Sequence, residues 1–102
     1  MKILKPYRDR IDSIDDRIVD LLVERISVIR EVAPVKFEHN IPAVLQDRVD
    51  EVRERAAARA GGKGLDPDMV RQLYAILIAF SCDLEAAIAA DMKSSGKKAA
   101  QR

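Results

Sequence analysis

The most regular pattern in the sequence is an apolar seam over roughly residues 5–35. Its members recur every three or four residues, which is the repeat of packed helices. They are Leu4, Tyr7, Ile11, Ile14, Ile18, Leu21, Val28, Val32 and Val35. A helix of about thirty residues is about 45 Å long. The rest of a short chain cannot cover so long a helix, so the pattern predicts that a second chain covers part of the seam.

Arg25 is the only charged residue in this seam. A guanidinium among Ile, Leu and Val side chains loses hydration that apolar neighbours cannot replace. It must therefore reach solvent, pair with a carboxylate of a packed helix, or bind an anionic ligand. From this residue alone, a structural ion pair and a ligand both remain open.

The end of the first helix is marked by Pro34, which removes one backbone hydrogen bond. We expect a bend there, followed by another turn that carries Lys36. The next segment, residues 37–44, contains Asn40 and Pro42 and predicts a loop.

Two further helices follow. Apolar residues spaced three or four apart predict a shorter helix over about residues 45–60, and the glycines of residues 61–64 end it. Asp66 and Pro67 have the residue types of a helix N-cap and first helical position. The third helix is expected to reach about Ala90.

These elements predict an all-α fold, a chain of a long, a short and a long helix that associates with a second copy. We expect one helical domain over residues 1–92. The remaining segment, residues 93–102, is basic, small and polar and predicts a disordered tail.

Composition narrows the class of protein. The chain has 102 residues, and its 18 basic and 17 acidic residues leave a formal net charge of +1, which gives no strong field for nucleic acid or an anionic membrane. Cys82 has no partner for an internal disulfide and lies in an apolar helical pattern, which is typical of a buried thiol. The N-terminus lacks the apolar core of a secretory signal, and no apolar run approaches membrane-spanning length. We therefore expect a reduced, cytoplasmic protein.

The polar residues allow a small anion site. Arg25 and Lys36 are eleven residues apart, almost three helical turns, and share a face about 16 Å apart. Arg8 lies about 25 Å from Arg25 along the same helix, so it can join the site only from a second, antiparallel chain. On the third helix, Ser81 and Glu85 are one turn apart and point polar groups toward the expected core. No metal-ligand or nucleophile–base pattern accompanies them, so we expect neither a metal nor a cofactor.

The sequence resembles the all-helical class of chorismate mutases from Tyr7 to about Ile88. The stretches that carry the resemblance are YRDRIDSIDDRIVDLLVERISVIREV, VKFEHNIPAV, DRVDEV and GLDPDMVRQLYAILIAFSCDLE. That family forms intertwined three-helix dimers in which each active site takes one arginine from the other chain. The resemblance implies such a homodimer here, with chorismate as the dianionic substrate.

The resemblance also implies a role for each matched residue. For substrate binding, Arg25 matches the carboxylate-binding arginine and Arg8 the arginine donated across the dimer. Arg48 matches the second-helix arginine near the site, and Ser81 a serine near the ring carboxylate.

Two residues are implied to be catalytic, Lys36 and Glu85. They match the residues that donate hydrogen bonds to the ether oxygen of the breaking bond, although many bacterial members have glutamine at the second position. The rearrangement of chorismate to prephenate is concerted and needs no cofactor. Because an ionised carboxylate cannot donate a hydrogen bond, Glu85 must be protonated in the working state, which predicts an activity optimum on the acidic side.

Three positions depart from the family pattern. Leu45 and Val49 replace an acidic pair that well-known bacterial members carry, the glutamate of which contacts the ring hydroxyl of chorismate. Pro34 lies where the family usually continues with Gly and Lys. The leading prediction is a chorismate mutase of the shikimate pathway, toward phenylalanine and tyrosine. An amino analogue as substrate, an isochorismate-pyruvate lyase that makes salicylate, and a non-catalytic helical interaction module remain as alternatives.

Overall fold

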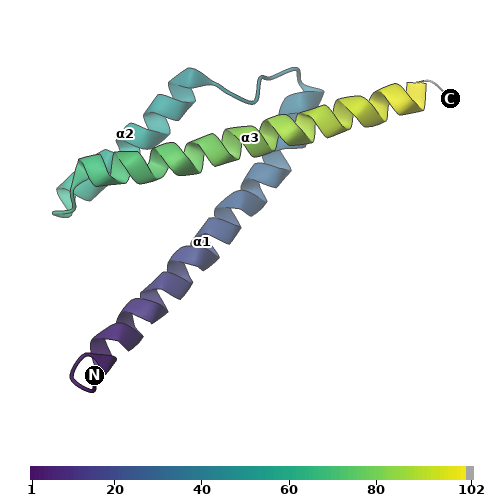
Figure 1. The fold of residues 1–102 in the computed structure, drawn as a ribbon. Helices are drawn as coiled ribbons and strands as arrows, with labels where there is room; N and C mark the ends of the chain where they lie inside the picture. The colour runs from purple at the N-terminus through teal and green to yellow at the C-terminus, as the bar shows by residue number, and fades with distance from the viewer. Residues whose placement is uncertain (101–102) are drawn as a thin grey trace.

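Three helices make up the part of the chain that the computed structural model describes, residues 1–100, with side chains to residue 96 (Figure 1). They are α1 (Lys5–Glu38), α2 (Gln46–Gly62) and α3 (Pro67–Ala100). The prediction of an all-helical chain with a long, a short and a long helix is confirmed.

The first helix, α1, continues through Pro34 and ends at Glu38, so it carries Lys36 as predicted. Pro34 therefore lies inside one uninterrupted helix. The helix ends because Asn40 adopts a positive φ of 57°, which lets the N–H of Ile41 donate to the Lys36 carbonyl at 2.8 Å.

The boundaries of the other two helices follow from their end residues. Gly64, with a φ of 78°, provides the turn after α2. The Asp66 carboxylate then accepts a hydrogen bond from the backbone N–H of Asp68 at 2.9 Å and caps the start of α3, as predicted.

The predicted end of the third helix near Ala90 is wrong, because α3 continues to Ala100. Lysine, serine and alanine are compatible with a helix. Gly96 lowers helix stability by only about 1 kcal/mol relative to alanine. The helix therefore runs into the segment that we expected to be a tail. The division into a domain over residues 1–92 and a tail over residues 93–102 stays a prediction, and residues 101–102 lie outside the described part of the chain.

The helices are arranged around α3, which packs against both α1 and α2, whereas α1 and α2 do not pack against each other. The N-terminal half of α1 extends away from the other two helices (Figure 1). The buried apolar residues are few and mostly small; they are Ala33, Ala57, Ala60, Val70 and Ile78. One chain alone therefore has a thin core.

The apolar seam of α1 is largely exposed in the single chain. Tyr7, Ile11, Ile14, Ile18 and Leu21 are each at least half exposed. Leu73, Ile76 and Phe80 of α3 are exposed to a similar degree. Burying such surface stabilises a protein by about 25 cal/mol per Å², so these side chains favour association.

The expectation that no apolar run approaches membrane-spanning length is wrong for α3. The stretch from Pro67 to Gly96 is long enough to cross a membrane and contains an 18-residue window with a mean hydropathy of 1.8, which is apolar enough by composition. The core helix of a soluble protein has the same features. In α3 the most apolar part also contains Ser81 and Glu85, which are buried against the rest of the chain.

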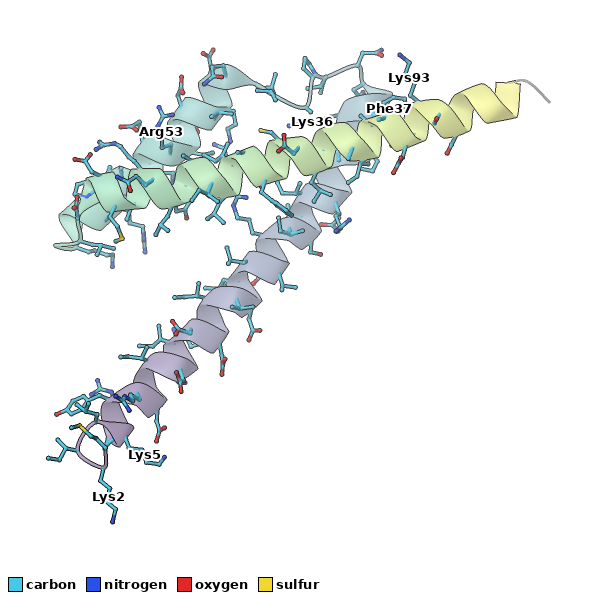
Figure 2. The ribbon with its side chains drawn as sticks, viewed as in Figure 1. Lys2, Lys5, Lys36, Phe37, Arg53 and Lys93 are labelled. Atoms are coloured by element: carbon cyan, nitrogen blue, oxygen red, sulfur yellow. The ribbon has the colours of Figure 1, made fainter. Side chains whose placement is uncertain are left out.

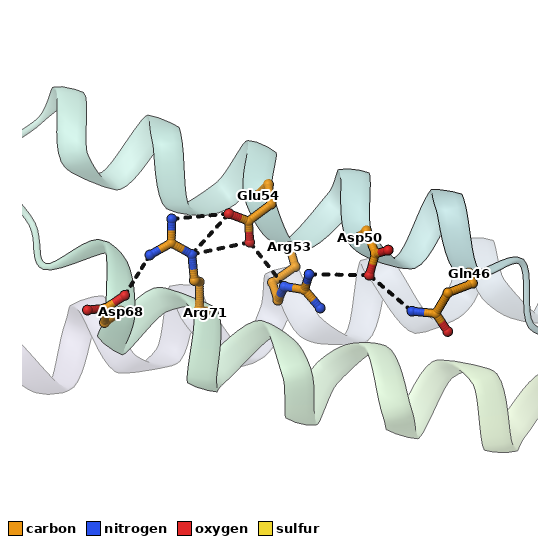
Figure 3. A network of polar contacts seen from close by, with 6 residues as sticks. All are labelled: Gln46, Asp50, Arg53, Glu54, Asp68 and Arg71. Carbon is orange, nitrogen blue, oxygen red and sulfur yellow. Dashed lines mark hydrogen bonds and ion pairs between the residues drawn. The ribbon is translucent and has the colours of Figure 1, made fainter.

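An ion-pair network joins the outer faces of α2 and α3 (Figure 3). Arg71 of α3 contacts Glu54 of α2 at 3.1 Å and Asp68 at 2.6 Å. Glu54 also contacts Arg53, which reaches Asp50. The hydrogen bond from Arg53, followed by those from Arg71, holds the pKa of the Glu54 carboxyl below its ordinary value. The network therefore favours the ionised carboxyl in the folded state.

We expect Glu54→Gln to lower the melting temperature by about 1–3 °C at low salt, because it weakens the contact between α2 and α3. A lowered pKa stabilises the fold above the unfolded pKa of the group, and this contribution is lost as the pH falls through the folded value. The difference between the variant and the wild type should therefore be present at pH 7 and vanish once the pH has fallen below the lowered pKa of Glu54 in the folded protein. Thermal melting at several pH values measures it, with Glu51→Gln, whose partner Arg48 is on the same helix, as the control.

Candidate functional site

Five of the six predicted site residues line one cavity of about 310 Å³ between the three helices. Arg25 and Lys36 come from α1, Arg48 from α2, and Ser81 and Glu85 from α3. Lys36 lies near the crossing of α1 and α3 (Figure 2). The fold thus brings together residues that are up to 60 positions apart in the sequence.

Arg25 is held by the buried hydroxyl of Ser81. Its Nη1 donates a hydrogen bond to Ser81 Oγ at 2.6 Å, and that hydroxyl donates in turn to the Leu77 carbonyl at 2.9 Å. Among the described side chains, no carboxylate pairs with Arg25. The structural ion pair considered from the sequence is therefore not formed among the described residues, and no carboxylate there neutralises the guanidinium.

Lys36 and Glu85 contact each other at the wall of the cavity. Lys36 Nζ lies 2.9 Å from Glu85 Oε1 and donates a hydrogen bond to the Ala43 carbonyl at 3.2 Å. The contact with Glu85 has an ion-pair distance but not the angle of a hydrogen bond, so Oε1 has no hydrogen-bond partner within the described residues. Only 5% of Glu85 is exposed. The ion pair with Lys36 therefore compensates the burial of this carboxylate.

The charges of the cavity favour a small dianion. Three cations, Arg25, Lys36 and Arg48, line it together with one carboxylate, Glu85. Arg48 also contacts Glu51 at 2.6 Å, but both side chains are more than half exposed, where such a pair is weak. The wall therefore carries an excess of positive charge that a ligand with two carboxylates can balance.

The remaining wall of the cavity is apolar and includes Leu45 and Val49. The half-buried Cys82 lies beside them. Burial, followed by the negative charge of Glu85, raises the pKa of the Cys82 thiol, so it stays protonated at neutral pH and is a poor nucleophile.

Arg8 is the predicted site residue that a single chain does not bring to the cavity. It is exposed near the N-terminus of α1, beside Lys5 and Asp9, and Figure 1 shows this end of α1 far from the crossing with α3.

Sequence reasoning missed the Ala43 carbonyl and the Cys82 thiol as part of the site. The position of Cys82, one residue after Ser81 and three before Glu85 on the same helix, was a usable signal for its place at the cavity. The Ala43 carbonyl depends on the path of a loop and had no such signal. The described part of the chain contains no cluster of three His, Cys, Asp or Glu residues that could hold a metal ion.

Comparisons with known proteins agree with this site. Residues 7–86 match the family model of chorismate mutase type II. The chain is 32% identical over 82 residues to the 4-amino-4-deoxychorismate mutase of Streptomyces venezuelae, which covers 80% of each protein, and 30% identical to that of Streptomyces pristinaespiralis over 80% of this chain and 64% of the relative.

A relative named chorismate mutase, from Methanocaldococcus jannaschii, is 26% identical over 93% of this chain and 96% of its own length. No solved structure gives a significant match. Since the family model covers most of the chain, from the first turn of α1 to the cavity residue Glu85, the chain belongs to the type II chorismate mutase family, whose members are isomerases.

Proposed function

We propose that this protein is a homodimeric chorismate mutase that rearranges chorismate to prephenate in the 310 Å³ cavity. The observation that carries the proposal is the cavity itself, in which Arg25, Lys36 and Arg48 share one wall with Ser81 and the buried Glu85. A concerted rearrangement needs a folded reactive conformer and donors for the charge that develops on the ether oxygen. The cavity can supply both.

Substrate binding is assigned to Arg8, Arg25, Arg48 and Ser81. Arg25, oriented by Ser81, holds one substrate carboxylate through charge-assisted hydrogen bonds. Arg48 holds the substrate from the α2 side of the cavity. Arg8 comes from the second copy of the chain. The exposed seam of α1 supports this arrangement, because an antiparallel partner helix would both cover the seam and carry its own Arg8 toward the site.

Catalysis is assigned to Lys36 and Glu85. The Lys36 ammonium donates a hydrogen bond to the ether oxygen as the carbon–oxygen bond breaks. Removing one such donor from an enzyme typically costs a factor of about 10²–10³ in kcat. Glu85 supplies the second donor, which requires the proton on its carboxyl group.

The contact between Lys36 and Glu85 uses the ionised carboxylate, whereas donation to the substrate requires the protonated one. We therefore expect protonation of Glu85 to limit the rate at neutral pH, so that kcat/KM rises as the pH falls.

We expect Glu85→Gln to flatten this pH profile between about pH 5 and pH 8, because an amide donates a hydrogen bond without needing a proton. At pH 7.5 the variant should equal or exceed the wild type. Initial rates at several pH values measure the effect. Asp83→Asn, an exposed change on the same helix, is the matched control and should keep the wild-type profile. An unaltered pH dependence in Glu85→Gln would remove Glu85 from the mechanism.

The choice of substrate depends on Leu45 and Val49, which form an apolar wall without a carboxylate. This wall leaves the ring hydroxyl of chorismate without an acidic partner. A second candidate substrate is therefore the amino analogue, which also gives two relatives their names, 4-amino-4-deoxychorismate mutase.

Parallel incubations with chorismate, 4-amino-4-deoxychorismate and isochorismate, followed by product identification, test the substrate. Prephenate as the fastest product supports the proposal. Faster turnover of the amino analogue changes the substrate and keeps the reaction. Salicylate and pyruvate from isochorismate identify a lyase, and no turnover of any of the three supports the interaction module. We place the protein in the cytoplasm, as expected from the sequence.

A further inference from the structure

The loop that follows α1 holds Lys36 at two points. The Lys36 carbonyl oxygen accepts a hydrogen bond from the backbone N–H of Ile41 at 2.8 Å. The Lys36 ammonium donates a hydrogen bond to the Ala43 carbonyl at 3.2 Å. The chain therefore turns back directly after the helix, and residues 41–43 lie beside the lysine to which we assign catalysis.

Asn40 makes this return of the chain possible. It has a φ of 57° and is the only residue other than glycine in the described part of the chain with a positive φ. Its N–H donates to the Phe37 carbonyl at 3.2 Å, and the following N–H, of Ile41, donates to the Lys36 carbonyl. These two bonds form a Schellman motif, which needs one residue in the left-handed conformation after the helix. Pro42 then favours an extended backbone at Ile41, so the helix does not resume.

Asn40 itself lies outside the cavity. The residue is exposed and is not among those that line the site. Asparagine and glycine adopt the left-handed conformation more readily than other residues, because glycine has no Cβ and the short side chain of asparagine can form local hydrogen bonds. The contribution of Asn40 is therefore its backbone conformation.

The Ala43 carbonyl and the Glu85 carboxylate anchor the Lys36 ammonium in different ways. The carboxylate lies 2.9 Å from Lys36 Nζ, but this ion pair is lost when the carboxyl takes up the proton that the proposed mechanism requires. The backbone carbonyl carries no titratable charge, so it holds the ammonium in both states. Because an ammonium has three N–H donors, anchoring one of them at the carbonyl leaves donors with a defined direction for the substrate.

We propose that Asn40 is a positioning residue for Lys36, because its left-handed backbone conformation places the Ala43 carbonyl against the lysine ammonium. The proposal rests on the proposed function for the catalytic role of Lys36. A misplacement of about 1 Å in an active site can lower a rate about a hundredfold. An exposed loop residue thus controls the rearrangement without contacting the substrate.

The test compares Asn40→Val with Asn40→Gly. A β-branched residue is strongly disfavoured at a positive φ, whereas glycine adopts it freely. We expect Asn40→Val to lower kcat about tenfold or more and to change KM by less than about twofold, because the ammonium acts mainly in the transition state. Asn40→Gly should keep at least half of the wild-type kcat. An undiminished kcat in Asn40→Val, or an equal loss in Asn40→Gly, would overturn the proposal.

The end of α2 provides a matched control, because it has the same backbone pattern. Gly64 has a φ of 78°. Its N–H donates to the Gly61 carbonyl at 3.3 Å, and the N–H of Leu65 donates to the Ala60 carbonyl at 2.9 Å. A Cβ at Gly64 would have no heavy atom within 4 Å, so Gly64→Val adds backbone strain without a clash at Cβ.

We expect Gly64→Val to lower the melting temperature, as Asn40→Val does, but to keep the wild-type kcat. Both constants are measured well below the melting temperature of each variant, so that the assayed protein is folded. A similar loss of kcat in the two valine variants would mean that strain acts through stability alone, and it would overturn the positioning role of Asn40.

An NMR measurement separates this proposal from the proposed function. The two Hε protons of Lys36 have different chemical shifts when the ammonium is held in one orientation, and the difference shrinks as the side chain gains freedom. We expect Asn40→Val to reduce this difference, and Asn40→Gly and Gly64→Val to keep it. That result supports the positioning role even if the protein turns over no substrate. An equal difference in the wild type and in Asn40→Val overturns it even if prephenate is formed.

Discussion

Arg25→Met is expected to lower prephenate formation at least a thousandfold and to leave the fold intact. A factor of a thousand corresponds to about 4 kcal/mol of transition-state binding, which is reasonable for a charge-assisted contact between an arginine and a carboxylate. The wild-type fold gains little from Arg25, since its one hydrogen-bond partner among the described side chains is the neutral Ser81.

The stability of Arg25→Met should equal or exceed that of the wild type. Methionine fits the apolar neighbours Val28 and Ile29, and Ser81 keeps its hydrogen bond to the Leu77 carbonyl. Melting temperature and kcat/KM are measured on the same preparations, with Arg30→Met, an exposed change on the same helix, as the control. A large loss of stability would assign Arg25 a structural role, and retained activity would exclude it as the carboxylate ligand.

Mixing Arg8→Ala chains with Arg25→Met chains is expected to restore about a quarter of the wild-type activity per chain, although each variant alone is nearly inactive. Random pairing makes about half of the dimers mixed. In a mixed dimer, the site built on the Arg8→Ala chain has its own Arg25 and receives an intact Arg8 from its partner. The other site lacks both arginines. One site in four is therefore complete.

The two variants are unfolded together, refolded and assayed, and the activity of the mixture is compared with that of each variant treated in the same way. A mixture that stays as inactive as its components would contradict a shared site. Full activity of Arg8→Ala alone would also contradict it, because the site would then be complete without the second chain.

Much of the cavity was predictable from the sequence because it depends on helical spacing. The distance of eleven residues between Arg25 and Lys36 put them on one face of a helix, and the distance of four between Ser81 and Glu85 did the same on another. Arg25, a charged residue in an apolar seam, indicated which face of the first helix carries the polar site residues. These spacings predict relative positions in the folded protein because each helix is nearly rigid.

Other features depend on weaker or longer-range effects. The end of α3 was placed too early because the change in composition after Ala90 is a matter of helix propensity, and no proline stops the helix. Pro34 removes only one backbone hydrogen bond from the helix, and α1 continues past this residue. The backbones of α1 and α2 do not pack closely against each other, which no local pattern in the sequence records.

The structure of a single chain does not bring Arg8 to the cavity. Figure 1 places the N-terminus of α1 at the far end of the molecule from the crossing with α3, and Arg8 does not line the cavity of its own chain. The exposed side chains of Ile11, Ile14 and Ile18 give that association an apolar driving force. The sequence indicated the need for a partner, and the mixing experiment decides whether it donates the arginine.

The most direct test of the central claim is the rate of prephenate formation from chorismate at pH 7.5, by the wild type and by Lys36→Met. We expect the wild type to accelerate the reaction by several orders of magnitude and Lys36→Met to lower kcat by a factor of about 10²–10³, because the donor to the ether oxygen is lost. A wild-type rate equal to that of chorismate in buffer, or an undiminished rate in Lys36→Met, would contradict the assignment of this cavity as the site of the rearrangement.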